Sequence, residues 1–286
     1  MIDRLNKLDK KIINKEIADI DNYLDNKILL KLFAEVDSTN NRAKDFIQRE
    51  HQNKVFSDQI DLKDLIVFAA DRQNSGRGRR GHSWFSNNSA SLSVSFLFKS
   101  KVELNKIPQI TAAAALAVQD SFNSFSLKSR IKWPNDIIID DKKICGILSE
   151  LVFSPQKEAF VIIGCGLNLN NESFEREIKD IATSYFLETN KKIDKNLFLA
   201  ELIKNMNSYI ESYFSSKKDN LIKRWKDELE LIGKKIDLNY KNKEYTVIIK
   251  DITNQGELLI SLENGEEKII QSVNSSLDYE SLKKYN

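Results

Sequence analysis

The sequence contains few of the residues from which metal sites and disulfide scaffolds are built. Its 286 residues include two cysteines, two histidines and three prolines. Cys145 and Cys165 lie inside apolar runs and form no C-x-x-C pair, so we interpret them as buried free thiols. The two histidines, His51 and His82, are too few for a histidine-rich metal site, and we expect no metal-ligating residues. The P-loop pattern and the H-E-x-x-H pattern are also absent.

The sequence also lacks long apolar runs and a strong excess of one charge. No stretch of about 18 apolar residues occurs, so no membrane-spanning helix is predicted. The N-terminus carries charges throughout and has no apolar core of a signal peptide. The 44 basic and 42 acidic residues nearly balance, which argues against a protein that coats nucleic acid. We therefore expect a soluble cytoplasmic protein that binds neither DNA nor membrane.

Apolar patterning predicts a mixed α/β body followed by a small all-β unit. Strands are predicted at 29–36, 65–71, 91–98, 129–140 (two strands joined by a turn), 142–153 and 158–170, and helices at 37–46, 107–122, 195–214 and around 221–225. In residues 91–98 apolar residues alternate with serines, which predicts a strand with one buried face. Residues 233–275 contain short β-like runs separated by N-Q-G and E-N-G turns, and these indicate a small barrel.

The segment G-R-G-R-R-G (76–81) fits the dinucleotide-binding pattern G-x-G-x-x-G, but its surroundings do not. That pattern requires a strand before the loop and a helix directly after it. The apolar run at 65–71 supplies the strand, whereas the residues after the loop lead into a second strand at 91–98. Glu103 stands at about the distance expected for a ribose-binding acid, but in a polar connector. We therefore disfavour a dinucleotide site.

Two other interpretations of the glycine loop remain open on its residues alone. Glycines let backbone N–H groups approach an anion, and Arg77, Arg79 and Arg80 add forked donors suited to phosphate or carboxylate. Like charges at this density repel one another, so an anion-binding loop would become ordered when its ligand binds. The alternative is a solvated basic turn, which is what most charge runs are.

Three further segments contain residues that suit a binding or catalytic role, but each also has a purely structural interpretation. K-W-P-N-D (132–136) places amide and carboxylate groups at a turn between strands, although such turns also occur without function. K-K-I-C-G-I-L (142–148) is either a strand with solubilising lysines at its edge or a strand whose Lys143 meets a phosphate. G-C-G-L-N-L-N (164–170) either ends a buried strand or shapes a purine pocket.

Taken in order, five segments resemble the biotin–protein ligase family, the biotin–[acetyl-CoA-carboxylase] ligases. They are D-S-T-N (37–40), G-R-G-R-R-G-H-S-W-F-S (76–86), and the three segments at 132–136, 142–148 and 164–170. The resemblance covers about residues 29–275. It implies an α+β fold: a mixed-sheet catalytic domain like that of class II aminoacyl-tRNA synthetases, followed by an SH3-like barrel. The expected domains are an N-terminal extension (1–28), a catalytic domain (29–231) and a C-terminal domain (232–286).

The resemblance also implies a reaction and its substrates. Biotin and Mg-ATP would form biotinyl-5′-AMP and pyrophosphate, and the acyl group would then pass to a lysine of a biotin carboxyl carrier domain. Arg79 resembles the arginine that stabilises and retains the adenylate, and Lys143 the lysine at the biotin carboxyl and α-phosphate. Asp136 is similar to the acid that helps the acceptor lysine lose its proton. The resemblance therefore implies biotin, ATP and Mg²⁺ as ligands and these three residues as catalytic.

The remaining matched positions are implied to bind the substrates. Ser38, Thr39 and Gln73 resemble the residues that hold the ureido head of biotin, with backbone groups of Arg77 and Gly78. On the adenine side, the matches are Trp84, Asn135 and Asn168. Three more matched positions complete the expected binding set: Asn40, Gly76 and Gly146.

The sequence departs from the family pattern at two places. His82 stands where the family loop often continues with arginine, which weakens the case for tight anion binding. Residues 1–28 are too short for the winged helix-turn-helix domain of bifunctional members, so no DNA-binding repressor activity is expected. Homodimerisation is common in the family, but no feature of the sequence establishes it.

Two rival functions are considered. One is a lipoate–protein ligase or octanoyltransferase, which shares the catalytic fold, and the other is a vitamin-binding regulator that forms no adenylate.

Overall fold

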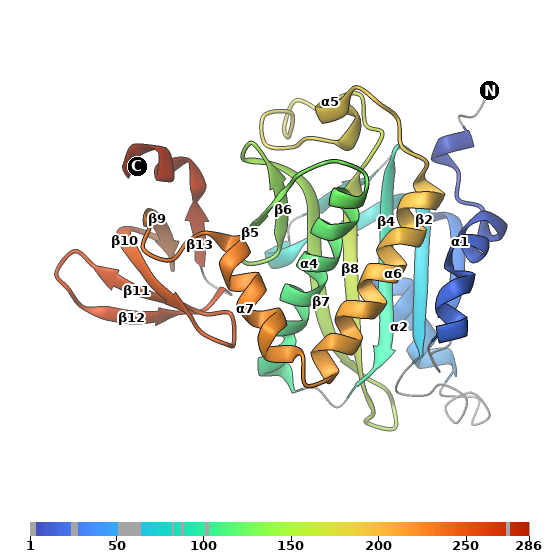
Figure 1. Cartoon of the computed structure of the whole chain (residues 1–286), viewed down its shortest axis with the longest axis horizontal. Coiled ribbons are helices and arrows are strands. Elements are labelled where there is room, and N and C mark those ends of the chain that lie inside the picture. The colour runs from blue at the N-terminus through green and yellow to red at the C-terminus, as the bar shows by residue number, and fades with distance from the viewer. Residues whose placement is uncertain are drawn as a thin grey trace.

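Two separate β-sheets organise the chain (Figure 1). The computed structural model describes residues 4–23, 28–50, 64–81, 83–86, 89–100, 103–272 and 275–285. One sheet belongs to the N-terminal body and has eight strands, while the other lies near the C-terminus and has five. The prediction of a mixed α+β fold with a small C-terminal β unit is therefore confirmed.

The large sheet is mixed, with one parallel pair at one edge. Its strands are β1 (Ile28–Val36), β2 (Leu65–Arg77), β3 (Ser83–Ser86), β4 (Ser91–Lys99), β5 (Arg130–Lys132), β6 (Asp136–Ile139), β7 (Lys142–Phe153) and β8 (Ala159–Asn168). They lie in the order β1-β2-β4-β8-β7-β6-β5, and β3 pairs with the end of β2. Strands β1 and β2 are parallel and the other pairs antiparallel. A strand therefore follows the glycine loop, as the sequence predicts.

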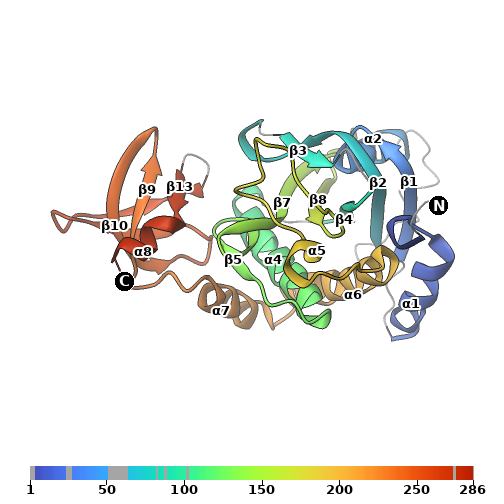
Figure 2. The ribbon, with the colours of Figure 1, turned by 90° about the horizontal axis from the view of Figure 1, so that it is seen from above.

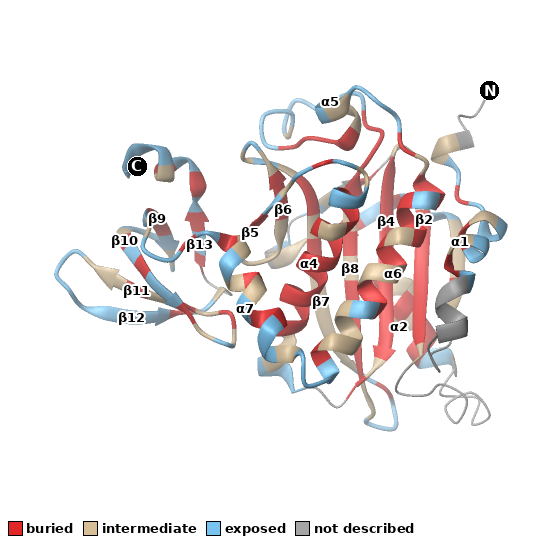
Figure 3. Ribbon diagram, in the orientation of Figure 1, coloured by how far each residue is buried: buried red, intermediate tan, exposed pale blue. Residues whose placement is uncertain are grey.

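Helices cover both faces of this sheet (Figures 1 and 3). They are α1 (Lys10–Tyr23), α2 (Thr39–Glu50), α4 (Ile107–Ser124), α5 (Tyr185–Thr189), α6 (Lys195–Phe214), α7 (Lys218–Leu229) and α8 (Leu282–Tyr285), with short 3₁₀ turns at Arg4–Asn6, Arg79–Gly81, Leu104–Lys106 and Tyr279–Ser281. Helices α4 and α6 pack side by side over one face, because the small alanines of α4 allow close approach. Helix α2 packs on the opposite face, where Phe46 and Ile47 contact Phe68 and Leu97 of the sheet.

The serine face of β4 is buried, which corrects the prediction of a strand with one buried face. Ser91, Ser93 and Ser95 are each at most 2% exposed, as are Leu92 and Val94 on the other side. The serines are covered because β4 is central in the sheet and helix α2 packs across their side. Buried hydroxyls need hydrogen-bond partners, so this face carries polar contacts inside the domain.

The small sheet is antiparallel and packs beside the β5 end of the large one (Figure 2). Its strands are β9 (Lys235–Tyr240), β10 (Lys243–Ile252), β11 (Leu258–Leu262), β12 (Glu267–Ile270) and β13 (Ser275–Asp278), in the order β12-β11-β10-β9-β13. Trp133 joins the two units: its indole Nε1 donates to the Gly256 carbonyl at 2.9 Å, and its backbone N–H donates to the Tyr279 hydroxyl at 2.9 Å. Trp133 is thus an interface residue.

Several expectations from the sequence can be compared with the described residues. Cys145 and Cys165 are buried and free, as predicted, and burial raises the pKa of the Cys165 thiol to about 12. Within the described ranges, no helix is long and apolar enough to cross a bilayer. His51 and His82 lie outside the described residues.

Candidate active site

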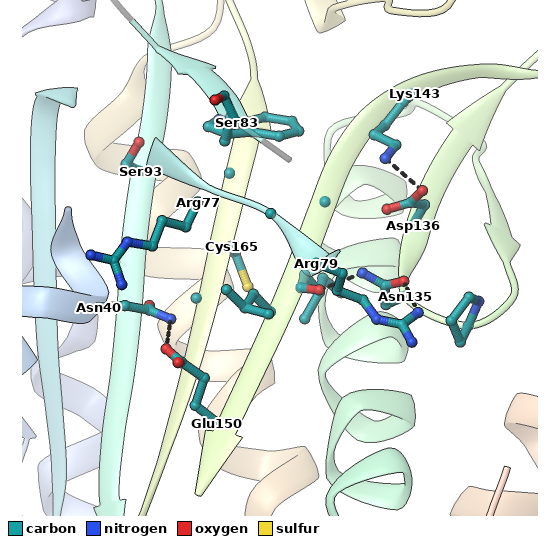
Figure 4. Close-up of a pocket in the computed structure, with 18 of the residues that line it drawn as sticks. Asn40, Arg77, Arg79, Ser83, Ser93, Asn135, Asp136, Lys143, Glu150 and Cys165 are labelled. Carbon is teal, nitrogen blue, oxygen red and sulfur yellow. Dashed lines mark hydrogen bonds and ion pairs between the residues drawn. The ribbon is translucent and has the colours of Figure 1, made fainter. Parts of the chain in front are cut away.

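The five recognised segments converge on one cavity of about 250 Å³ (Figure 4). Four walls come from the start of α2, the glycine loop at the end of β2, the turn between β5 and β6, and the adjacent strands β7 and β8. The sheet order explains this meeting. Strands β2, β4, β8, β7 and β6 lie next to one another, so segments that are far apart in the sequence come together. Predicted residues that line the cavity are Ser38, Thr39, Asn40, Gln73, Arg77, Gly78, Arg79, Trp84, Asn135, Asp136, Lys143 and Gly146.

One end of the cavity is lined by amides and hydroxyls, and its carboxylate, Glu150, is paired with Lys44 at 2.7 Å. Thr39 directs its backbone N–H and its hydroxyl to the Gln73 Oε1 at 2.9 and 3.3 Å. The Asn40 carboxamide donates to Glu150 at 2.8 Å. Thr39, Asn40 and Gln73 are all at most 6% exposed, so each side chain is held in one orientation. Such fixed amides and hydroxyls suit an uncharged, hydrogen-bonding ligand group.

The opposite end of the cavity carries the cationic side chains. Lys143 Nζ lies 2.6 Å from Asp136 Oδ2, across the β6–β7 pair. The Arg79 guanidinium donates to Asn135 Oδ1 at 3.0 Å and to the Ser272 carbonyl and hydroxyl at 2.9 and 3.0 Å. In Figure 4, the Lys143–Asp136 and Arg79–Asn135 pairs lie to one side of Cys165, while Asn40 and Glu150 lie to the other. An acidic or phosphorylated group would meet two cations here.

Glycines give the cavity a flat floor. Gly146 and Gly166 are directly opposite one another in the β7–β8 ladder, and the indole of Trp84 lies over both. A Cβ at Gly166 would lie 2.2 Å from Trp84 Cε2, and one at Gly146 would lie 3.1 Å from Trp84 Cζ3. The Trp84 Nε1 is buried and, among the described residues, has no hydrogen-bond partner. An unpaired buried donor of this kind is expected where a ligand supplies the missing acceptor.

Comparisons with known proteins agree with this geometry. Residues 34–168 match the model of the biotin/lipoate A/B protein ligase family, and residues 231–275 match the biotin protein ligase C-terminal domain. The chain belongs to the biotin protein ligase family. The first match covers all five recognised segments up to Asn168, and the second covers four strands of the small sheet and the first residue of β13.

Individual relatives extend the likeness. The bifunctional ligase/repressor BirA of Bacillus spizizenii is 32% identical over 208 residues, covering 72% of this chain and 63% of that protein. The biotin–[acetyl-CoA-carboxylase] ligase of Mycobacterium tuberculosis is 26% identical, covering 70% and 74%. The crystal structure of the Aquifex aeolicus biotin protein ligase in complex with biotin and ATP superposes with a TM-score of 0.71 at 27% identity, covering 87% and 98%. The chain thus spans less than two thirds of the BirA relative's length.

Two residues predicted from the family motifs lie away from the cavity wall. Gly76 lines a shallower hollow on the outer side of the loop, together with Asn74 and Ser75. Asn168 is 4% exposed, and its Nδ2 donates to the Thr183 carbonyl at 3.0 Å and the Lys143 carbonyl at 3.4 Å. Its Oδ1 accepts no hydrogen bond from the described residues. Asn168 therefore fixes the backbone at Lys143 and keeps one acceptor available.

The sequence analysis did not predict several residues that line the cavity. Ser93 and Glu150 line the cavity from β4 and β7, and Ser275 and Ser276 line it from the small sheet. The serines at alternate positions of β4 were a usable signal for Ser93, because alternate residues of a strand share one face. The contribution of the small sheet has no local signal, since it depends on how the two units pack.

Proposed function

We propose that the protein is a biotin–protein ligase that activates biotin with Mg-ATP to biotinyl-5′-AMP and transfers biotin to a lysine of a carrier domain. One observation carries the proposal: a single cavity joins an end lined by amides and hydroxyls to an end where Lys143 and Arg79 lie. Biotin has the matching polarity, with an uncharged ureido head and a carboxylate tail. Membership of the family and the biotin and ATP in the Aquifex aeolicus structure support it.

In the first step, a biotin carboxylate oxygen attacks the α-phosphorus of ATP and pyrophosphate leaves. Negative charge accumulates on the α-phosphate, and Lys143 and Arg79 are the cations at that end of the cavity. Lys143 would exchange its partner Asp136 for the phosphate. Binding both reactants in one cavity removes much of the entropic barrier to their encounter, up to roughly 7–11 kcal/mol in favourable cases.

In the second step, the acceptor lysine nitrogen attacks the acyl carbon and AMP leaves. The amine must be neutral to act as a nucleophile, and we assign Asp136 as the group that takes its proton. Once Lys143 turns to the phosphate, the Asp136 carboxylate becomes available for this role. On the adenine side we assign Trp84, Asn135 and Asn168, whose Oδ1 can accept from an amino group.

We assign Mg²⁺ to the nucleotide substrate rather than to a resident site. The two carboxylates of the cavity wall, Asp136 and Glu150, are paired with Lys143 and Lys44. Within the described residues, no group of three His, Cys, Asp or Glu side chains could hold a metal ion. The ion would therefore bind ATP phosphates.

The proposed acceptor is a biotin carboxyl carrier domain, and the proposed compartment is the cytoplasm. Residues Gly76–Gly81 lie beside the outer hollow, which opens next to the cavity at Arg77–Arg79 and gives an incoming lysine a route. A homodimer remains an expectation from the family resemblance.

The test is labelling of a carrier domain with radiolabelled biotin or lipoate in the presence of Mg-ATP, with pyrophosphate release measured in parallel. Biotin transfer with pyrophosphate release is the expected result. Labelling by lipoate alone would identify a lipoate ligase. Biotin binding without pyrophosphate release would identify a vitamin-binding regulator instead.

Replacing Arg79 with alanine is expected to release the adenylate. The side chain donates three hydrogen bonds, to Asn135 and to Ser272 of the C-terminal unit, and its loss removes a cation and opens that side of the cavity. Loss of charge-assisted contacts should speed adenylate release about tenfold to a hundredfold.

The measurement is chromatographic detection of free biotinyl-AMP and labelling of bystander proteins. Arg72→Ala is the control, because Arg72 lies on β2, the strand that leads into the glycine loop, has 52% of its side chain exposed and pairs with Glu35. Equal retention of the adenylate by both variants would remove Arg79 from its assigned role.

A further inference from the structure

A chain of hydrogen bonds leads from the protein surface into the end of the cavity that is lined by amides and hydroxyls. Its first link is an ion pair in which Lys44 Nζ lies 2.7 Å from Glu150 Oε1. The second oxygen of Glu150 accepts from Asn40 Nδ2 at 2.8 Å, a contact drawn in Figure 4. Glu150 is on β7 and Asn40 is in the first turn of α2, so this carboxylate connects the sheet to the helix that opens the site.

The chain continues through the buried serine face of β4. Ser95 Oγ lies 2.5 Å from Asn40 Oδ1 and 2.7 Å from Thr39 Oγ1. Its hydroxyl has one hydrogen, which goes to the Asn40 oxygen because an amide oxygen can only accept. Thr39 in turn donates to Gln73 Oε1. The packing around Asn40 is tight, because a Cβ on Gly164 would lie 2.3 Å from Asn40 Oδ1.

The two ends of this chain fix the direction of its two amide side chains. A carboxylate only accepts, so the Asn40 carboxamide must turn its nitrogen to Glu150 and its oxygen to Ser95. A backbone N–H only donates, so Gln73 must turn its oxygen to Thr39. The Nε2 of Gln73 is then the end of that side chain left to donate to a ligand in the cavity.

We propose that Glu150 is a specificity-determining positioning residue that selects the head group of the substrate. By holding Asn40 and, through Ser95, Thr39 in place, it keeps the Thr39 backbone N–H against Gln73 Oε1 and so leaves Gln73 Nε2 to donate to the ligand. Lys44 balances the charge of Glu150, so the end remains suited to an uncharged ligand. This inference rests on the proposed function, which it deepens.

The competing head groups differ in how strongly they accept a hydrogen bond. A cyclic urea has a carbonyl oxygen that accepts strongly from an amide N–H. The dithiolane of lipoate has only sulfur, which is a weak acceptor, and the end of an octanoyl chain has none. A fixed donor therefore favours the urea, since a buried donor left unpaired is costly.

The deciding variant is Glu150→Gln, which keeps the shape but can donate as well as accept. Asn40 can then turn over, which loosens the hold on Ser95 and Thr39 and thereby on the Gln73 carboxamide. We expect the KM for biotin in the pyrophosphate-release assay to rise about tenfold to a hundredfold. The KM for ATP should change less than about twofold, and the preference in kcat/KM for biotin over lipoate should fall.

Glu158→Gln is the matched control. Glu158 forms an ion pair with Lys99, and its side chain is 30% exposed, against 29% for Glu150. Glu158 stands beyond the far end of β7, away from the cavity. A general loss of stability would affect both variants alike, whereas the inference expects only Glu150→Gln to change the KM for biotin.

A second pair of variants keeps the test decisive if Glu150→Gln unfolds. Lys44→Met leaves the carboxylate but removes its anchor and should raise the biotin KM in the same direction by a smaller factor. Ser95→Ala interrupts the chain, so adding Lys44→Met to it should have less effect than in the wild-type chain.

Three outcomes have distinct meanings. An unchanged biotin KM in Glu150→Gln or, where that variant unfolds, in Lys44→Met overturns the inference. An equal rise in the KM for biotin and ATP also overturns it, because positioning of the head group should affect biotin alone. Absence of biotin-dependent pyrophosphate release by the wild-type chain would instead reject the proposed function, before any variant is compared.

Discussion

Replacing Lys143 with alanine should reduce biotin adenylation about a hundredfold to a thousandfold, the range found when a preorganised charge-stabilising donor is removed. Lys143 lies at the start of β7, where a bridge to Ala182 and the Asn168 carboxamide fix its backbone. Its Nζ is 2.6 Å from Asp136 in the cavity wall. Because the α-phosphate gains further negative charge as the new bond forms, the loss should fall on kcat more than on the KM for biotin.

The adjacent lysine provides a control for this prediction. Lys142 has the same charge and the same strand, but its side chain is exposed and does not line the cavity. Lys142→Ala should therefore retain adenylation within about twofold, as surface substitutions usually do. Stopped-flow or pyrophosphate-release rates at saturating biotin and ATP would measure the difference. Full activity in Lys143→Ala would mean that the α-phosphate lies elsewhere.

Replacing Lys195 with methionine should lower the free energy of unfolding by about 3–5 kcal/mol, the usual cost of removing one partner of a buried ion pair. The Lys195 side chain is fully buried, and burial lowers the pKa of its amine even though Asp71 stands beside it. Its Nζ donates to Asp71 Oδ1 and the Asn6 carbonyl, both at 3.2 Å, and to the Ser89 carbonyl at 2.9 Å. Without the amine, a carboxylate and two carbonyls lose their donor.

Urea unfolding of Lys195→Met and two further variants would check this expectation. Lys204→Met is the control, since Lys204 is on the same helix but half-buried, and its loss should cost less than about 1 kcal/mol. The double variant Asp71→Asn/Lys195→Met should recover part of the stability, because a neutral amide can still accept from the Leu8 N–H. Equal stability of Lys195→Met and Lys204→Met would show that the buried pair contributes little.

The N-terminal residues are held against the body of the protein by contacts that the sequence did not predict. Residues 1–28 were predicted only as a charged N-terminal extension. In the structure Ile13 and Ile17 of α1 are buried against the body, and Asn196 exchanges hydrogen bonds with the backbone of Lys7 and Asp9. No pattern within residues 1–28 specifies these contacts, because the partners are about 190 residues away in the sequence.

The sequence predicted the elements well where one local pattern decides the structure. Period-two and helical spacing located the main strands and helices, and a strand rather than a helix follows the glycine loop, as predicted. The β4 serines show the limit of this reasoning. Their alternation predicted a strand correctly but an exposed face wrongly, since burial depends on what packs across the strand. Helix α2 covers that side, and only the three-dimensional arrangement places it there.

The sequence by itself determined which residues have the chemistry of the site: the glycines, Arg79, Lys143 and the amides of the five segments. Only the tertiary structure decided which groups they meet. It joined Arg79 to Ser272 of the small sheet, and it linked Glu150 through Asn40 and Ser95 to Thr39. The physical reason is that hydrogen bonds and ion pairs act over a few ångströms in space, while the sequence specifies order along the chain.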